Sequence, residues 1–208
     1  MNAEQTVLAH DLLWGLPVSA LPDDAPDWVV DAVRFGHPLV VRRALAQVGQ
    51  VAVGVRGPRR EQRYATFMAL ADVQRRVRPE QLTQIVGENN WPALQALAQI
   101  RPLMNALGLI WGVSGSAGFE LASGIAALHQ HSDLDLIVRT PDFVSRVWAA
   151  GLVHKLDDAV CRIDVQLQTP CGAVALREWA GASRQVLLKS ASGAELVAEP
   201  WHLEEVCS

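Results

Sequence analysis

Two aspartates interrupt an apolar run in the second half of the chain, within Ser132-Asp133-Leu134-Asp135-Leu136. The alternation of polar and apolar residues is typical of a β-strand, whose successive side chains point to opposite faces. Asp133 and Asp135 would then share one face, while the two leucines face the core. Because burying an unpaired charge is costly, the face with the carboxylates is either exposed to solvent or binds something.

A third aspartate, Asp164, lies in a later apolar run over 160–167. By itself it could be a strand-end carboxylate paired with Arg162 or another arginine. If its strand lies beside that of the first two, the three carboxylates would repel one another strongly without a bound cation. Magnesium combines one or two carboxylates with substrate phosphates and water. We therefore predict that the catalytic residues and metal ligands of a phosphoryl-transfer site are Asp133, Asp135 and Asp164.

Upstream, Gly115-Ser116 ends one predicted strand and begins a predicted helix. Free backbone N–H groups at a helix start bind phosphate, and glycine adds no side chain to block the approach. We expect Gly115 and Ser116 to bind substrate phosphates. The segment is not a Walker loop, because neither G-x-x-x-x-G-K-[ST] nor G-x-G-x-x-G is present. Each motif is weak alone, since the aspartate pair could belong to a half-exposed strand and Gly-Ser to a turn, but their order indicates a site.

Arginines are concentrated in the first half of the chain. Of the 18 basic residues 16 are arginines, and seven of these lie between Arg56 and Arg78. The net charge of −4 argues against bulk nucleic-acid binding. The planar guanidinium suits phosphate or carboxylate, so we predict that Arg56, Arg59 and Arg63 bind substrate phosphates or an acidic partner. The alternative is a solvated helix face with ion pairs of little value.

The 208 residues, half of them hydrophobic, predict an α/β (α+β) protein with two domains, over 1–88 and 89–208. The first is a smaller α/β domain. There we expect a helix over 27–33, strands over 38–42 and 50–55 and an amphipathic helix over 60–77. A helical connection follows over 79–107, which Pro102 should break or kink. In the second domain we expect strands over 109–113, 134–139 and 159–168, helices over 117–122, 141–150 and 173–179, and a final hairpin over 186–198.

The amino terminus lacks the basic start and apolar stretch of a signal peptide, and no later run is long enough to span a bilayer. We therefore expect a cytoplasmic protein that binds neither membrane nor nucleic acid. Cys161, Cys171 and Cys207 form no C-x-x-C pair, so we expect reduced thiols, with Cys161 in the core. His129 and His131 have no third ligand nearby for a metal site, and their role stays open.

The order strand, Gly-Ser, helix, aspartate pair and later aspartate resembles the nucleotidyltransferase superfamily of DNA polymerase β. The longer string over 111–124, with its Gly-Phe-Glu, is similar to a narrower family, the phosphoribosyl-dephospho-CoA transferases (holo-acyl-carrier-protein synthases) of malonate decarboxylase. His10-Asp11-Leu12-Leu13-Trp14 and the segment over 53–59 also resemble that family. The resemblance covers nearly the whole chain. It implies a C-terminal polymerase-β-like nucleotidyltransferase domain and an N-terminal domain that binds substrate or carrier protein.

The resemblance also implies a reaction. These enzymes transfer the phosphoribosyl-dephospho-CoA part of 2'-(5''-triphosphoribosyl)-3'-dephospho-CoA to a serine of the apo acyl carrier protein subunit of malonate decarboxylase, releasing diphosphate. Gly115 and Ser116 would hold the leaving phosphates, and the aspartate pair would bind Mg2+. Asp164 would complete the metal site or help deprotonate the serine. Two alternatives stay open: a nucleotidyltransferase with another acceptor, and a non-catalytic nucleotide-binding module on the same fold.

Overall fold

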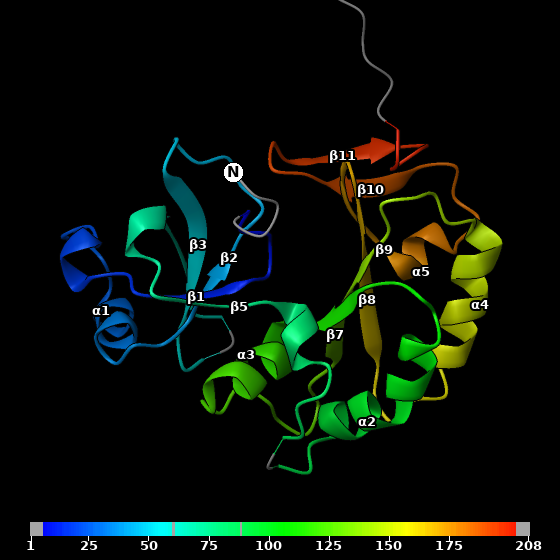
Figure 1. Cartoon of the computed structure of the whole chain (residues 1–208), viewed down its shortest axis with the longest axis horizontal. Helices are drawn as coiled ribbons and strands as arrows, with labels where there is room; N and C mark the ends of the chain where they lie inside the picture. Colours follow the sequence, from blue (N-terminus) through cyan, green and yellow to red (C-terminus); the bar gives the residue numbers. More distant parts are fainter. Residues whose placement is uncertain (1–5, 60, 88, 203–208) are drawn as a thin grey trace, which may run out of the picture.

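Two β-sheets, each packed on an apolar core of its own, make up the fold (Figure 1). The computed structural model describes residues 6–59, 61–87 and 89–202. The strands of the first sheet lie within residues 12–77, and those of the second sheet lie within residues 111–197. The predicted mixed α/β organisation in two parts is thereby confirmed. The predicted boundary at residue 88 falls on a residue outside the described ones.

The first sheet has five antiparallel strands in the order β4-β3-β2-β1-β5. The strands are β1 (Leu12–Trp14), β2 (Leu39–Val41), β3 (Gln50–Arg56), β4 (Arg63–Ala69) and β5 (Arg75–Val77). Helix α1 (Asp27–Arg34) packs against β3. It buries Val29, Ala32 and Val33. The second and third of these lie three and four positions after the first, which places all of them on one face of the helix. The predicted helix at 27–33 and the strands at 38–42 and 50–55 are confirmed.

The predicted amphipathic helix over 60–77 is wrong. The described part of this segment forms β4, the 3-10 turn η3 (Leu70–Asp72) and β5. Its apolar residues recur at helical spacing, but β4 alternates between more and less exposed positions. It also pairs with β3 over its whole length, from Ala69 opposite Gln50 to Arg63 opposite Arg56. This pairing satisfies the backbone N–H and C=O groups that the two strands turn toward each other, which outweighs the short helical period of the sequence.

The second sheet has six strands in the order β11-β10-β9-β8-β7-β6, and only β7 and β8 are parallel neighbours. The strands are β6 (Trp111–Val113), β7 (Leu134–Arg139), β8 (Ile163–Thr169), β9 (Gly172–Ala175), β10 (Val186–Lys189) and β11 (Ala194–Val197). Helices α2 (Pro92–Asn105) and α3 (Gly115–Ser123) contact β7, α5 (Leu176–Trp179) contacts β8, and α4 (Arg146–Leu156) contacts α5. In Figure 1, α3 lies between the two sheets.

The strands and the final hairpin of this half agree with the prediction, whereas three helix predictions differ in extent. Helix α4 begins later than residue 141, because the Ser145 hydroxyl accepts from the N–H of Trp148 and caps it there. The predicted helix over 173–179 is split, because β9 pairs with β8 before α5 begins. Within the described residues, the connection over 79–107 forms the 3-10 turn η4 (Pro79–Leu82) and α2, which continues through Pro102 to Asn105 without breaking.

A buried ion pair anchors the segment over 10–14. The Asp11 side chain is fully buried, and its Oδ2 accepts from the N–H of Leu8 at 2.8 Å and from Nη2 of Arg76 at 2.7 Å. Burial raises the pKa of the Asp11 carboxyl, and these two partners only partly offset that effect. Arg75 stacks on the ring of Trp14 next to this pair. The segment is therefore tied to β5.

No helix in the described part of the chain is long and apolar enough to cross a membrane. The thiols of Cys161 and Cys171 are free, whereas Cys207 lies outside the described residues. Cys161 packs partly buried against the second core. Burial and the nearby charge of Asp133 raise its pKa, which keeps the thiol protonated and poorly nucleophilic.

Candidate active site

The predicted carboxylates meet where two parallel strands begin. Strands β7 and β8 pair with Asp135 directly opposite Asp164. Asp133 lies one residue before β7 and is exposed, while Leu134 and Leu136 are buried in the core. The side chains of all three aspartates line one cleft. We predicted that Asp133 and Asp135 share one face of the strand while the two leucines face the core. This prediction is confirmed.

Gly115 begins α3 directly beside the carboxylate of Asp135. Its φ of 61° lies in the left-handed region that glycine adopts readily. A Cβ at this position would collide with Oδ2 of Asp135. The N–H of Ser114 also donates to the backbone carbonyl of Asp135 at 2.9 Å. The site therefore needs glycine for both conformation and space, and the start of α3, with its free N–H groups, lies at the carboxylates.

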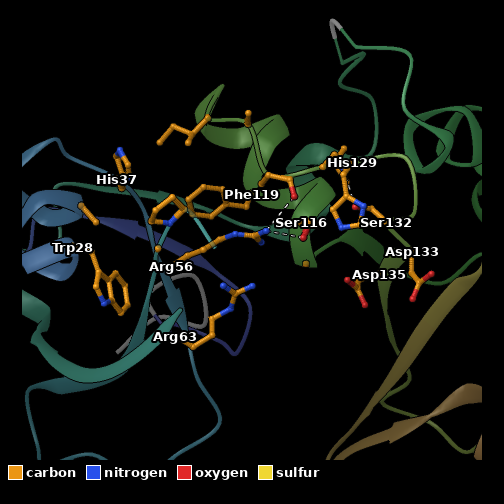
Figure 2. A pocket seen from close by; sticks show the side chains of 18 of the residues that line it. Trp28, His37, Arg56, Arg63, Ser116, Phe119, His129, Ser132, Asp133 and Asp135 are labelled. Atoms are coloured by element: carbon orange, nitrogen blue, oxygen red, sulfur yellow. Dashed lines mark hydrogen bonds between the residues drawn. The ribbon is translucent and has the colours of Figure 1, made fainter. Parts of the chain in front are cut away.

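The cleft has a volume of about 730 Å³ and lies between the two halves of the chain. Its C-terminal wall includes Gly115, Ser116, Asp133, Asp135 and Asp164. Its N-terminal wall includes Trp28, Phe35, His37, Arg56 and Arg63. Figure 2 shows the two arginines reaching between the walls, with Trp28 and His37 on one side and the aspartate pair on the other. The cleft thus brings a cationic and aromatic wall to face an acidic one.

Asp164 has an ionic partner of its own in Arg162, whose Nε lies 2.9 Å from Oδ1 of the carboxylate. Both side chains are substantially exposed, so the pair contributes little stability. Among the described residues, no three His, Cys, Asp or Glu side chains are grouped closely enough to hold a metal ion. Asp133 and Asp135 do offer the oxygen ligands that a hard cation takes together with substrate phosphates. The pair fits Mg2+, while the part of Asp164 stays a prediction.

The structure brings two of the three predicted arginines to the cleft. Nη2 of Arg56 donates to Oγ of Ser116 at 3.0 Å and to the carbonyl of Ala127 at 3.1 Å. Its guanidinium also lies over the ring of Phe119. Arg63 lines the cleft beside it, but Arg59 does not line it. Arg60, a further member of the cluster, lies outside the described residues. Arg56 is therefore a direct link from the N-terminal wall to the Gly-Ser turn.

Other arginines join the two halves away from the cleft. Nη2 of Arg43 donates to Oε1 of Gln166 on β8 at 3.2 Å. Nη2 of Arg75 donates to the carbonyl of Ala122 at the end of α3. The abundance of arginine in the first half therefore serves the junction between the halves as well as the cleft.

Glu120 is a positioning residue that was not predicted from the sequence. Its side chain is 9% exposed, and Oε2 accepts from the N–H groups of Ala127 and Leu128, both at 2.8 Å. Oε1 accepts from Nδ2 of Asn89. Burial alone would raise the pKa of Glu120, but these hydrogen bonds and the charge of Arg56 outweigh it and lower the pKa. Glu120 thus holds the loop before β7 against α3. The Gly-Phe-Glu string, which contains this glutamate, was the feature of the sequence that could have pointed to it.

His129 and His131 lie on the same loop and line the cleft. The N–H of His131 donates to Nδ1 of His129 at 3.1 Å, and the N–H of His129 donates to Oγ of Ser132 at 3.0 Å. Because Nδ1 accepts a hydrogen bond, the neutral ring of His129 carries its proton on Nε2. This ring is therefore a hydrogen-bond donor at the edge of the cleft.

A second cavity, of about 450 Å³, adjoins the first and shares Arg56, Arg63, Gly115 and Phe119 with it. Its remaining lining is mainly apolar and includes Leu12, Val40, Tyr64, Leu82 and Val113. The binding surface at the Gly-Ser turn therefore continues beyond the cleft into an apolar cavity.

The two sheets and the cleft between them define a two-domain α/β protein whose site has the chemistry to bind a phosphorylated ligand. The sequence places this protein more narrowly. A family model described as the phosphoribosyl-dephospho-CoA transferase MdcG N-terminal domain matches residues 8–79, and one for the MdcG C-terminal domain matches residues 81–200. The chain therefore belongs to the phosphoribosyl-dephospho-CoA transferase family, and the predicted family and enzyme class are confirmed.

Curated relatives agree over almost their entire lengths. The phosphoribosyl-dephospho-CoA transferase of Pseudomonas syringae pv. tomato is 64% identical over 97% of this chain and 97% of its own. Proteins of the same description from Pseudomonas fluorescens and Pseudomonas aeruginosa are 60% and 51% identical, each over 95% of both chains. No solved structure matches the chain.

Proposed function

We propose that this protein transfers the phosphoribosyl-dephospho-CoA group from 2'-(5''-triphosphoribosyl)-3'-dephospho-CoA to a serine of the apo acyl carrier protein of malonate decarboxylase. The observation that carries the proposal is the contact between Gly115 and Asp135 at the start of α3, in a chain that matches both domains of the family. That contact places free helix N–H groups next to carboxylates. Phosphate and cation ligands are then side by side, as phosphoryl transfer requires.

In this reaction the serine oxygen forms a bond with the α-phosphorus of the triphosphate. The bond from that phosphorus to the diphosphate breaks, and the serine proton leaves to a base. The start of α3 and Arg56 would stabilise the negative charge that develops on the phosphate oxygens. Asp133 and Asp135 would hold Mg2+, which neutralises charge on the phosphates when bound. Asp164, freed from Arg162, would be the base nearest to this pair.

The test is the intact mass of the apo carrier protein after incubation with this protein, the triphosphoribosyl precursor and Mg2+. We expect the carrier to gain the mass of one phosphoribosyl-dephospho-CoA group, and to gain none when EDTA replaces Mg2+. Asp135→Asn keeps the size of the side chain but removes a charged ligand, so the rate should fall by orders of magnitude, on the order of 100-fold or more.

The matched control is Asp142→Asn, an exposed aspartate that lines neither cavity, and it should transfer at the wild-type rate. A near-normal rate for Asp135→Asn would show that this carboxylate is not a metal ligand. If the wild-type protein leaves the carrier unmodified but adenylates another acceptor, the acceptor in the proposal is wrong. If it binds the precursor and modifies nothing, the chain is a binding module.

A further inference from the structure

The end of the cleft farthest from the aspartate pair is aromatic. Trp28, Phe35 and His37 lie there, on α1 and the turn that follows it. Figure 2 shows Trp28 and His37 on the opposite side of Arg56 and Arg63 from the aspartates. No residue of this end takes part in the proposed phosphoryl transfer. A separate part of the ligand is therefore available to occupy it.

The aromatic side chains of this end are partly fixed and partly open. The ring of Trp28 packs on the turn at Gly57, where an added Cβ would lie 2.8 Å from it. Phe35, the residue that ends α1, is 73% exposed although it lines the cleft. An exposed phenylalanine of this size contributes little to the core of the free protein. Its ring is instead presented to whatever enters the cleft.

Charge divides the cleft along its length. Arg56 and Arg63 lie in the middle and favour the anionic parts of a ligand. At the aromatic end the charged lining residue is Asp31, which is paired with Arg34 at 3.1 Å. This pair carries no net charge, so it does not attract a phosphate. The aromatic end therefore suits an uncharged, flat group joined to phosphates.

We propose that the aromatic end of the cleft binds the adenine of the dephospho-CoA moiety, with Phe35 stacking on the base. The inference rests on the proposed function, because it takes the triphosphoribosyl-dephospho-CoA precursor as the ligand. That precursor has one planar aromatic group, and stacking of a base on an aromatic side chain favours binding. The pantetheine arm has no π-face, and the apolar second cavity beside Gly115 offers it a separate place.

The test is equilibrium binding of two fragments by calorimetry, with no transfer step. 3'-Dephospho-CoA contains the base, and 4'-phosphopantetheine lacks it. We expect Phe35→Ala to raise the Kd of 3'-dephospho-CoA on the order of tenfold, which is the low end of the range for losing one base–aromatic stack. The Kd of 4'-phosphopantetheine should not change. Phe35→Tyr, which keeps the ring, should restore the wild-type Kd.

The matched control is Phe67→Ala on β4, because this phenylalanine is 48% exposed and lines neither cavity. It should leave both Kd values unchanged. An equal loss for both fragments with Phe35→Ala would assign the aromatic end to the pantetheine arm and overturn the inference. An unchanged Kd for 3'-dephospho-CoA, with a raised KM for the carrier protein, would assign it to the carrier and overturn it as well.

The two proposals fail in different ways. If wild-type protein binds 3'-dephospho-CoA with Phe35-dependent affinity but never modifies the carrier protein, the adenine site stands and the proposed function fails. If the carrier is modified but Phe35→Ala binds 3'-dephospho-CoA as the wild type does, the function stands and the adenine site fails.

Discussion

The two walls of the cleft are built in different ways. The C-terminal wall takes Gly115, Ser116 and the three aspartates from strand ends and one helix start within 50 residues of chain, and the backbone register fixes their relative positions. The N-terminal wall takes Arg56 and Arg63 from β3 and β4, where the strand register sets them opposite each other, whereas side-chain packing brings α1 and the following turn to them. We infer that the first wall performs the chemistry and the second binds the ligand.

The largest expected effect comes from disturbing the register of the C-terminal wall. Gly115→Ala would place a Cβ against Oδ2 of Asp135 and strain a φ of 61°. Displacing a catalytic group by about 1 Å can cost roughly 100-fold in rate, so, with Asp135 as a proposed metal ligand, we expect kcat for carrier modification to fall by that order. KM for the triphosphoribosyl precursor should rise as well, because the start of α3 is also the proposed phosphate-binding site. Steady-state kinetics by intact mass measures both.

The same helix provides the control for this change. Gly124 ends α3 with a φ of 72°, and an added Cβ there would meet nothing within 4 Å. Gly124→Ala therefore carries the same conformational cost, about 1 kcal/mol of stability, without the collision. It should keep a normal kcat. Equal kcat losses in the two variants would mean that backbone strain, and not the contact with Asp135, limits activity.

This difference between the walls also explains what the sequence could reveal. The aspartates and Gly-Ser were predicted because each lies at the end of a strand or helix, where spacing along the chain determines position. The region over 60–77 was assigned to a helix, because its spacing alone does not show that β4 pairs with β3. Arg59 was grouped with Arg56 and Arg63 because the three lie close together in the sequence. In the structure Arg59 lies in the turn before β4, outside the cleft.

Contacts between distant segments were beyond a single sequence. Glu120 acts through backbone N–H groups of the loop at 127–128, and nothing in its own neighbourhood marks those partners. Phe35 is an ordinary apolar residue at a helix end until the fold places it in the cleft. The chemistry of the site was therefore predictable from local pattern, whereas the residues that hold and surround it required the tertiary structure.

A smaller effect is expected from the N-terminal wall. Arg56→Gln removes a guanidinium that reaches Ser116 and the ring of Phe119. Hydrogen bonds to charged groups contribute about 1.5–3 kcal/mol, so we expect KM for the triphosphoribosyl precursor to rise about tenfold or more. The dependence of KM on salt should weaken, because fewer charges attract the phosphates. The measurement is initial rate against precursor concentration at several salt concentrations.

Arg59→Gln is the matched control, since it removes the same charge from a residue outside the cleft. Its KM should stay near that of the wild type, and Arg63→Gln should fall between the two. If Arg59→Gln weakened binding as much as Arg56→Gln, the arginines would act through their summed charge rather than through position, and the N-terminal wall would not be a defined binding surface.

The smallest expected effect concerns the junction that holds the two walls together. Nε2 of His10 accepts from Nη2 of Arg43, which also donates to Gln166 on β8. Burial, with the positive charges of Arg43, Arg139 and Lys189, lowers the pKa of His10 to about 4. Its φ of 74° is left-handed, a conformation that asparagine tolerates. His10→Asn should therefore remove the imidazole and its titration while keeping the fold.

The sign of the pH effect follows from the lowered pKa. Between pH 6.5 and about 4 the unfolded chain binds a proton at His10 that the folded protein does not, so stability is full above pH 6.5 and falls as the pH decreases through this window. The loss from this group is at most about 3 kcal/mol.

Urea unfolding of both proteins from pH 4 to pH 8 measures this loss, because carboxylates titrate in both proteins and cancel in the difference. His10→Asn should lose less stability at low pH than the wild type does. If the free energy of unfolding changed with pH in the same way in both proteins, His10 would be protonated as easily in the folded protein as in the unfolded chain. Burial at the junction between the walls would then not disfavour the charged imidazolium.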